Sequence, residues 1–198
     1  TITKAPLGIA LAATYNGTTT YATGISTSGL VNSETITEVS INNANVASNA
    51  SNYITGITGG TANLANYALY STANTGSTGA LTGSVYTGTV SSNTNSGGTN
   101  KVALTPASAT VTGNSSTVTY TGLAQSVSGY TVIGYLGSDT SSSISGVTAG
   151  GASQTNAGTA TNTVSGSNSN YSLTLNNGTL TITKAPLGIA LAATYNGT

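Results

Sequence analysis

Six charged side chains are the first candidates for chemistry in this 198-residue chain. They are Lys4, Lys101, Lys184, Glu34, Glu38 and Asp139. The chain contains no His, Cys, Met, Trp, Phe or Arg. A Ser-His-Asp triad, a thiol nucleophile and a zinc site all require residues that are missing. We therefore expect no catalytic residues, no metal ligands and no cofactor, and we expect that the protein is not an enzyme.

Charge also limits the partners that the sequence predicts. Three acids spread over 106 positions do not predict a carboxylate cage for calcium. Three lysines without any arginine give no electrostatic footprint for nucleic acid. No stretch approaches the ~18–20 apolar residues that span a bilayer, so we expect no membrane insertion. The chain has neither an N-terminal Met nor a signal region, which suggests a piece of a longer protein.

Glu34 and Glu38 are the closest pair of acids. On a strand they would share a face and lie roughly 13 Å apart, at about 3.3 Å per residue. That is farther than the ~5–5.5 Å or ~6.5–9.5 Å between the paired carboxylates of glycosidases. A solvated strand face is the favoured interpretation.

The lysines leave a second chemistry open, a covalent crosslink from Lys to the side chain of Asn or Asp. It would require a buried Lys beside an acid. The favoured interpretation is an exposed Lys that blocks unwanted pairing at strand ends.

Thr-x-Thr pairs recur along the chain, at Thr1/Thr3, Thr35/Thr37, Thr117/Thr119, Thr161/Thr163 and Thr181/Thr183. Regular Thr ladders can bind ice, but these pairs are irregularly spaced. Alternating strands with Thr on the solvated face explain them without a ligand.

The eleven tyrosines are the only aromatic residues. They could stack on glycans, but a tyrosine in a small core with its hydroxyl near the surface is more common. Four tyrosines recur at equivalent places and are expected in the core: Tyr15, Tyr67, Tyr120 and Tyr171.

Composition predicts an all-β fold with small cores. Thr, Ser, Asn and Gly supply 114 of the 198 residues, and helix formers are scarce. β-Branched runs between turn residues predict strands. The expected strands are Glu34–Ile41, Ala62–Ser71, Ser84–Val90, Tyr130–Leu136, Tyr171–Leu175 and Thr179–Thr183. Asn177-Gly178 between the last two predicts an antiparallel hairpin, because both residues tolerate positive φ.

The strongest feature is an exact internal repeat. Residues 1–18 and 181–198 both have the sequence TITKAPLGIALAATYNGT, so the period is 180 residues. Shorter matches recur inside the period, such as Thr14-Tyr15 with Thr119-Tyr120 and Asn66-Tyr67 with Asn170-Tyr171. We predict two related modules, at 1–100 and 101–183, with residues 184–198 starting the next period. The first module carries extra residues at 71–100.

The sequence resembles a known family of repeats. ATYNGTT at 13–19, Ser28-Gly29-Leu30-Val31 and Asn66-Tyr67-Ala68-Leu69 resemble the YDG repeats of large bacterial haemagglutinin-like (filamentous) adhesins. Residues 156–186 resemble the end of their companion MBG repeats, whose name denotes a mostly β-grasp fold. The chain departs from the family at Asn16, where Asp is usual, and that departure puts any turn-capping or ion-binding role there in doubt.

Repeat and resemblance together lead to one expectation of function. We expect two small β-sandwich or β-grasp-like modules strung end to end in a tandem array. The array would form the filament or stalk of a secreted adhesin at the bacterial cell surface, with neighbouring copies of the repeat as partners. The alternative is a module that itself binds host or sibling-cell glycans or another partner, which a groove lined by two or more exposed tyrosines would favour.

Overall fold

A computed structural model describes residues 1–48, 52–69, 78–82, 85–89 and 101–197. Strands dominate these residues, and three single-turn 3-10 helices accompany them: η1 (Val46–Ser48), η2 (Leu64–Asn66) and η3 (Ser141–Ser143). The predicted all-β class is therefore confirmed. Most of the extra stretch 71–100, and the side chain of Lys101, lie outside the described residues.

The chain divides into two compact units. The first unit contains Thr1–Ala109, Ile133–Gly146 and Ser167–Thr174. The second contains Thr110–Val132, Val147–Gly166 and Leu175–Thr198. Because the units interleave along the sequence, the expected ranges 1–100, 101–183 and 184–198 stay predictions.

Strand β1 (Ala5–Thr14) organises the first unit. It pairs antiparallel with β3 (Ile25–Ser28) and parallel with both β6 (Tyr67–Leu69) and β9 (Lys101–Thr105). Leu7, Ile9 and Leu11 alternate along β1 and are at most 2% exposed. This period-2 pattern fits a strand that presents one face to a core.

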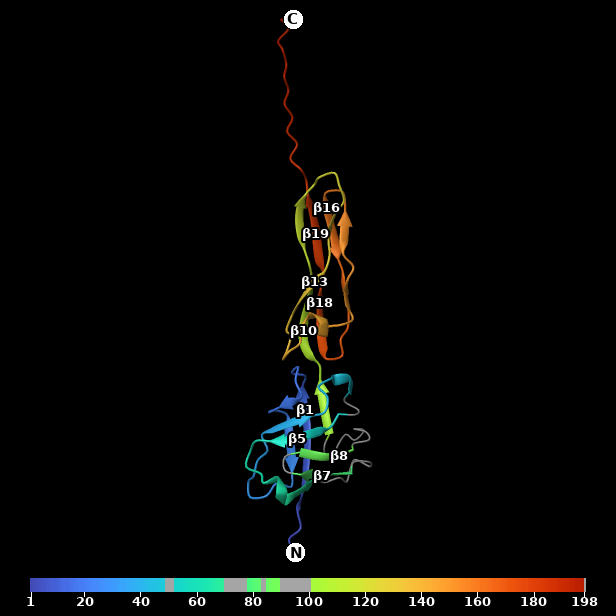
Figure 1. Cartoon of the computed structure of the whole chain (residues 1–198). Coiled ribbons are helices and arrows are strands. Elements are labelled where there is room, and N and C mark those ends of the chain that lie inside the picture. Colours follow the sequence, from blue (N-terminus) through green and yellow to red (C-terminus); the bar gives the residue numbers. More distant parts are fainter. Residues whose placement is uncertain (49–51, 70–77, 83–84, 90–100, 198) are drawn as a thin grey trace. The chain divides into compact units, whose positions relative to one another are not determined.

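A second sheet in the first unit has the order β2-β4-β5-β8-β7. Its strands are β2 (Thr20–Tyr21), β4 (Glu38–Ile41), β5 (Ile54–Thr58), β7 (Thr78–Thr82) and β8 (Val85–Thr89). Side chains from β2, β4 and β5 join those of β1, β6 and β9 in one buried cluster. In Figure 1, β7 and β8 lie side by side, as their antiparallel register requires.

The strands of the second unit lie in a small sheet and in two-stranded pairs. Strand β19 (Gly178–Thr183) pairs parallel with β11 (Ser116–Thr119) and antiparallel with β16 (Gly158–Asn162). The two-stranded pairs are β12 (Gln125–Val127) with β15 (Ala152–Gln154), and β14 (Val147–Ala149) with β17 (Val164–Gly166). Ala152, Leu180 and Ile182 form one cluster of buried residues in this unit, and Val111, Val147 and Val164 are buried as well.

A buried asparagine supports this small core. The Asn162 side chain is 0% exposed, donates to the carbonyls of Asn114 and Gly129, and accepts the Gly151 N–H. Its donors and its carbonyl oxygen thus all have partners, which offsets the cost of burying an amide.

The predicted hairpin at Asn177-Gly178 is wrong. Strand β18 (Tyr171–Asn176) belongs to a sheet with β10 (Ala107–Gly113) and β13 (Tyr130–Ile133), whereas β19 lies in another sheet. Gly178 does not have a positive φ. Instead, a Cβ at Gly178 would lie 2.2 Å from the Asn114 carbonyl oxygen, so glycine is required there by close packing.

The other predicted strands form, with shorter ends. Residues 171–175 and 179–183 lie inside β18 and β19. Of the predicted strand Glu34–Ile41, only Glu38–Ile41 pairs in a sheet. The predicted strand Tyr130–Leu136 ends at Ile133, before Gly134, which has a φ of 99°. The predicted strand over 62–71 begins as η2 and becomes β6. Strand β8 falls within the predicted 84–90, whose end residues lie outside the described part of the chain.

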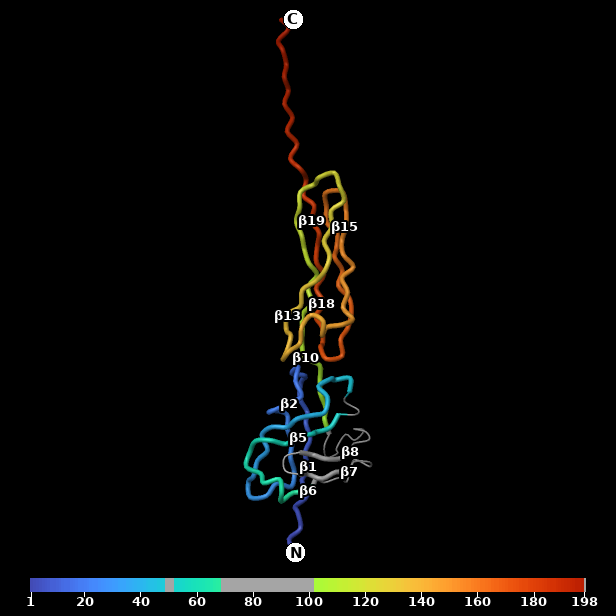
Figure 2. The backbone as a smooth tube through the Cα atoms, in the orientation of Figure 1, coloured from blue at the N-terminus to red at the C-terminus, as the bar shows by residue number. Residues whose placement is uncertain are grey.

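The C-terminal copy of the repeated sequence makes no strand. Residues 184–197 have no assigned element, and Figures 1 and 2 show them as an extended chain after β19. Leu187, Ile189 and Leu191 are 84–90% exposed there. The identical residues of the first copy, by contrast, lie in strand β1.

Candidate functional site

Two tyrosine side chains meet in the first unit at the carboxylate of Asp139. The hydroxyls of Tyr171 and Tyr15 both donate to Asp139 Oδ2, over 2.6 Å and 2.7 Å. The Leu136 N–H donates to the Tyr171 hydroxyl over 3.1 Å. The two tyrosine rings meet edge to face, with centroids 5.3 Å apart. We call this group the Asp139 cluster.

Burial and hydrogen bonding shift the ionisation of the whole cluster. Desolvation, and then the bond to Asp139, raise the pKa of Tyr171 to about 12 and that of Tyr15 further still. Desolvation raises the pKa of Asp139, but hydrogen bonds from Tyr171, Tyr15 and Ser143 outweigh it and leave the pKa below its ordinary value. The cluster therefore holds a carboxylate and two neutral phenols across the physiological range.

A second acid–tyrosine pair has the same design. The Tyr67 hydroxyl donates to Glu34 Oε2 and accepts the Val31 N–H, and the bond to Glu34 raises the pKa of Tyr67. Tyr67 and Tyr171 are 1% and 2% exposed. We call Glu34 and Tyr67 the Glu34 pair.

The two groups occupy equivalent places in the internal repeat. Val31 and Leu136, and Glu34 and Asp139, are each separated by 105 residues, and Tyr67 and Tyr171 by 104. The backbone follows the same spacing: Gly29 and Gly134 have φ of 85° and 99°, and Asn32 and Gly137 have φ of 52° and 58°. Matching left-handed residues at matching places show that one loop shape occurs twice.

Strand pairing repeats as well, although the spacing is 105 residues for one partner and 78 for the other. Thr14 pairs with Thr105 in the parallel ladder of β1 and β9, and Thr119 pairs with Thr183 in that of β11 and β19. The N–H of the following tyrosine, Tyr15 or Tyr120, donates over 2.8 Å to the carbonyl of Thr105 or Thr183 respectively.

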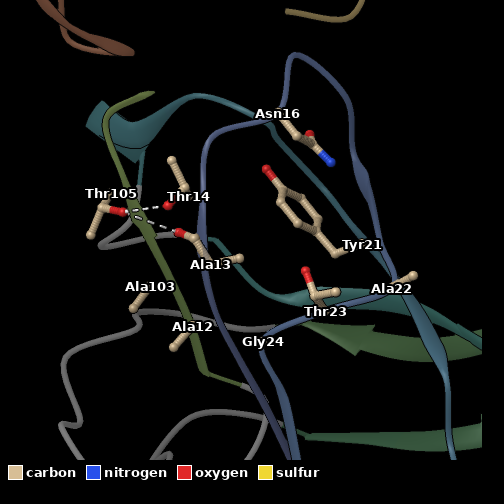
Figure 3. Close-up of a pocket in the computed structure, with 10 residues that line it drawn as sticks. All are labelled: Ala12, Ala13, Thr14, Asn16, Tyr21, Ala22, Thr23, Gly24, Ala103 and Thr105. Carbon is tan, nitrogen blue, oxygen red and sulfur yellow. Dashed lines mark hydrogen bonds between the residues drawn. The ribbon is translucent and has the colours of Figure 1, made fainter. Parts of the chain in front are cut away.

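Side chains repeat the pattern too. The Thr105 hydroxyl donates to the Ala13 carbonyl and the Thr14 hydroxyl, and the Thr183 hydroxyl donates to the Val118 carbonyl and the Thr119 hydroxyl. Figure 3 shows the Thr105 bonds. The weak internal repeat of the sequence thus corresponds to two copies of one contact set.

Sequence reasoning was right for three of the four recurrent tyrosines. Tyr15, Tyr67 and Tyr171 are buried, but Tyr120 is 40% exposed, so its predicted core position is wrong. Glu38 lies on β4 and accepts the Thr58 hydroxyl. The interpretation as a solvated strand face is wrong for Glu34. This residue lies outside β4, and its carboxylate accepts a hydrogen bond from the Tyr67 hydroxyl.

Asp139 was not singled out from the sequence. Its spacing of 105 from Glu34 was a usable signal, once Gly29 and Gly134 are aligned as well. The two acids differ in type, and Leu30 aligns with Tyr135, so the match is weak at the level of sequence.

The remaining candidates are simpler. Lys4 and Lys184 are exposed, which does not meet the requirement of a crosslink for a buried Lys. The side chains of the Thr-x-Thr pairs are exposed or half-buried, as expected. Asn16 caps its own turn, because its Oδ1 accepts the Thr18 N–H over 2.8 Å.

A shallow hollow of about 530 Å³ lies beside β1 in the first unit. Figure 3 shows small and hydroxyl side chains around it, and the Tyr21 ring pointing toward the chain at Asn16. Tyr21 is 3% exposed, and burial raises its pKa. This hollow contains one tyrosine, and a buried one, so it lacks the two exposed tyrosines expected of a glycan groove.

The described residues offer neither a metal site nor a membrane-spanning helix. Among them, no three His, Cys, Asp or Glu side chains gather where they could hold a metal ion. Nor does any helix in the described ranges have the length and apolar character needed to cross a bilayer.

Comparison with known proteins identifies no relative of this chain. Neither a family model, nor a curated protein, nor a solved structure matches the chain.

Proposed function

We propose that the chain is a structural tandem-repeat segment of an extracellular filament or stalk. The observation that carries the proposal is that the repeated sequence is buried in its first copy and exposed in its second. Leu7, Ile9 and Leu11 are 0–2% exposed in β1, whereas the identical Leu187, Ile189 and Leu191 are 84–90% exposed. Three large apolar side chains in a sequence that forms a core strand elsewhere indicate a strand that lacks its sheet.

The next copy of the repeat supplies the missing sheet. In the first unit, β1 is flanked by β3, β6 and β9, all of which come later in the chain. The second copy of β1 would need the same strands from the residues that follow it. Residues 184–198 are then the start of a further period, and the repeat continues along the chain or into a neighbouring copy.

Each period holds two small β-sandwich or β-grasp-like modules, at 1–100 and 101–183. The contacts that recur at a spacing of 104–105 residues support this division. Strung end to end, such modules form an extended array. Its partners are neighbouring copies of the same repeat, and it has neither a catalytic role nor a nucleic-acid ligand.

The adhesin resemblance supplies the setting: a secreted, haemagglutinin-like protein of the bacterial cell surface. A chain with three basic and three acidic side chains in 198 residues suits an environment of variable salt and pH. The absence of Cys suits export without disulfide formation.

Electron microscopy of the native assembly tests the proposal. We expect filaments whose axial repeat corresponds to one 180-residue period. Compact particles of limited size, with no axial repeat, would overturn it.

A further inference from the structure

The two acid–tyrosine groups differ in one respect. Asp139 accepts two tyrosine hydroxyls, whereas Glu34 accepts Tyr67 and no second tyrosine among the described residues. A carboxylate has two oxygens with about four acceptor sites, so Glu34 retains unused capacity. No second tyrosine of the described residues donates to Glu34 as Tyr15 donates to Asp139.

Tyr120 is the counterpart of Tyr15. Both follow the same strand position, and both donate their N–H to the equivalent threonine carbonyl over 2.8 Å. Yet Tyr15 is 5% exposed and Tyr120 is 40% exposed. No hydrogen bond from the Tyr120 hydroxyl is present within the described part of the chain. A tyrosine held by its backbone in a repeated position therefore lacks the partner that its counterpart has.

Two hollows border the two copies of the repeated sequence. One, of about 490 Å³, lies in the second unit between Tyr120 and the segment 184–187. The other, of about 550 Å³, lies in the first unit between the segment 2–5 and Ala65 with Asn66. We call them the Tyr120 hollow and the Asn66 hollow.

Both hollows share the stretch Lys-Ala, as Lys184-Ala185 in one and Lys4-Ala5 in the other. In a continuous array these are the same stretch. Tyr120 of one copy and Asn66 of the next then border a single segment. Tyr67, the residue after Asn66, pairs in register with Ala5.

We propose that Tyr120 of one copy docks on the Glu34 pair of the next copy of this repeat. Its hydroxyl donates to the Glu34 carboxylate, as that of Tyr15 donates to Asp139. This inference rests on the proposed function, since it requires a following copy. It assigns the residues that join one period to the next.

The arrangement has a physical advantage at a junction. A hydrogen bond to a carboxylate is stronger than one between neutral groups, and burial of the Tyr120 ring, which is 40% exposed in this chain, adds apolar area. A bond from a neutral phenol also leaves the charge of Glu34 unpaired by any cation, so the junction depends little on salt.

A chain that continues for two full periods allows the test, because it contains Tyr120 twice. Tyr120→Phe in the first copy removes the proposed donor, while the same change in the last copy affects a residue with no following copy. We expect the first-copy variant to lower the Tm by roughly 4 °C or more, and the last-copy variant to leave it unchanged. Equal effects at the two positions would overturn the proposal.

A double-mutant cycle identifies the acceptor. Glu34→Gln in the second copy should lower the Tm, and adding first-copy Tyr120→Phe should lower it by less than the sum of the two single effects. Additive effects would contradict the pairing. If the Glu34→Gln variant does not fold, absorbance titration of tyrosine replaces the cycle, in two-period chains that keep Glu34 and carry Tyr120→Phe in one copy only. The chain with Phe at the last-copy Tyr120 keeps the first-copy hydroxyl, so it should contain one more late-ionising phenol than the chain with Phe at the first-copy Tyr120. Identical titration curves would contradict the pairing.

Amide exchange at Leu187–Ala193 separates this inference from the proposed function. If these amides are protected in the two-period chain and Tyr120→Phe has the same effect at both positions, the array stands and the Tyr120 junction fails. If they exchange freely, the proposed array itself fails, and the junction with it.

Discussion

Residues 7–18 and 187–198 have one sequence and two environments. In the first copy, strand β1 pairs with three other strands, and the Leu11 side chain is 1% exposed. In the second copy, residues 187–197 form no ladder, and Leu191 is 90% exposed. Local preference is identical in the two copies, so neighbours alone decide whether the strand forms. This agrees with the view that β-propensity reflects packing more than backbone preference.

The largest expected difference between the two copies comes from their leucines. Leu11→Ala should destabilise the first unit by about 2–5 kcal/mol, because it leaves a cavity in a packed core. Leu191→Ala should change stability by less than about 0.5 kcal/mol. Thermal or denaturant unfolding of the matched variants checks this, and similar losses for both would refute the assigned environments.

Glycine substitutions extend the comparison to the second unit. Gly178→Val should cost about 3 kcal/mol, since a Cβ there would lie 2.2 Å from the Asn114 carbonyl oxygen. Gly188→Val is the control, because nothing lies within 4 Å of a Cβ at Gly188. An unchanged urea midpoint for Gly178→Val would show that Gly178 does not approach Asn114.

A smaller effect is expected from the repeated tyrosine. Tyr15→Phe removes one of the two hydroxyls that donate to Asp139 and should cost about 1–2 kcal/mol. Tyr195 occupies the same place in the second copy and is 90% exposed, so Tyr195→Phe should have no effect on unfolding. If the two variants unfold alike, the Asp139 cluster is not stabilising.

The smallest expected effect is that of pH. Between about pH 5 and 9 the free energy of unfolding should change very little. The folded pKa of Asp139 is lowered, so its contribution is present above the ordinary carboxyl pKa and is lost as pH falls through the folded value. The pKa values of Tyr15, Tyr67 and Tyr171 are raised, so their contributions are complete below the ordinary tyrosine pKa and are lost as pH rises through the folded values.

Unfolding curves measured across this range check the prediction. Tyr15→Phe should reduce the losses at both extremes, because Tyr15 contributes to the shift of Asp139 as well as to its own. A steep loss between pH 5 and 9 would point to a buried ionisable group that the account omits.

Strand positions could be predicted from the sequence, but strand partners could not. The alternation in residues 179–183 is strong enough to place β19. The Asn177-Gly178 signal failed because the Asn177 side chain instead accepts the Val164 N–H over 2.9 Å. A local turn preference of that kind is outweighed when a residue distant in sequence supplies a better hydrogen bond.

The acid–tyrosine groups mark a second limit. The four recurrent tyrosines were visible as a pattern, and three of them are buried as expected. Their acceptors were not predicted, because Glu34 and Asp139 lie 33 and 32 residues from Tyr67 and Tyr171, beyond the reach of short-range pattern reasoning. Tyr120 departs from the pattern because its surroundings depend on residues outside this chain in our proposal.

Hydrogen exchange at Leu187–Ala193 tests the central claim most directly. These amides should exchange at the rate of an unstructured peptide in the present chain. When the repeat continues for a second period, they should become as protected as those of Leu7–Ala13, because each copy of the strand then has its sheet. Fast exchange at 187–193 in the longer chain, beside slow exchange at 7–13, would contradict the account.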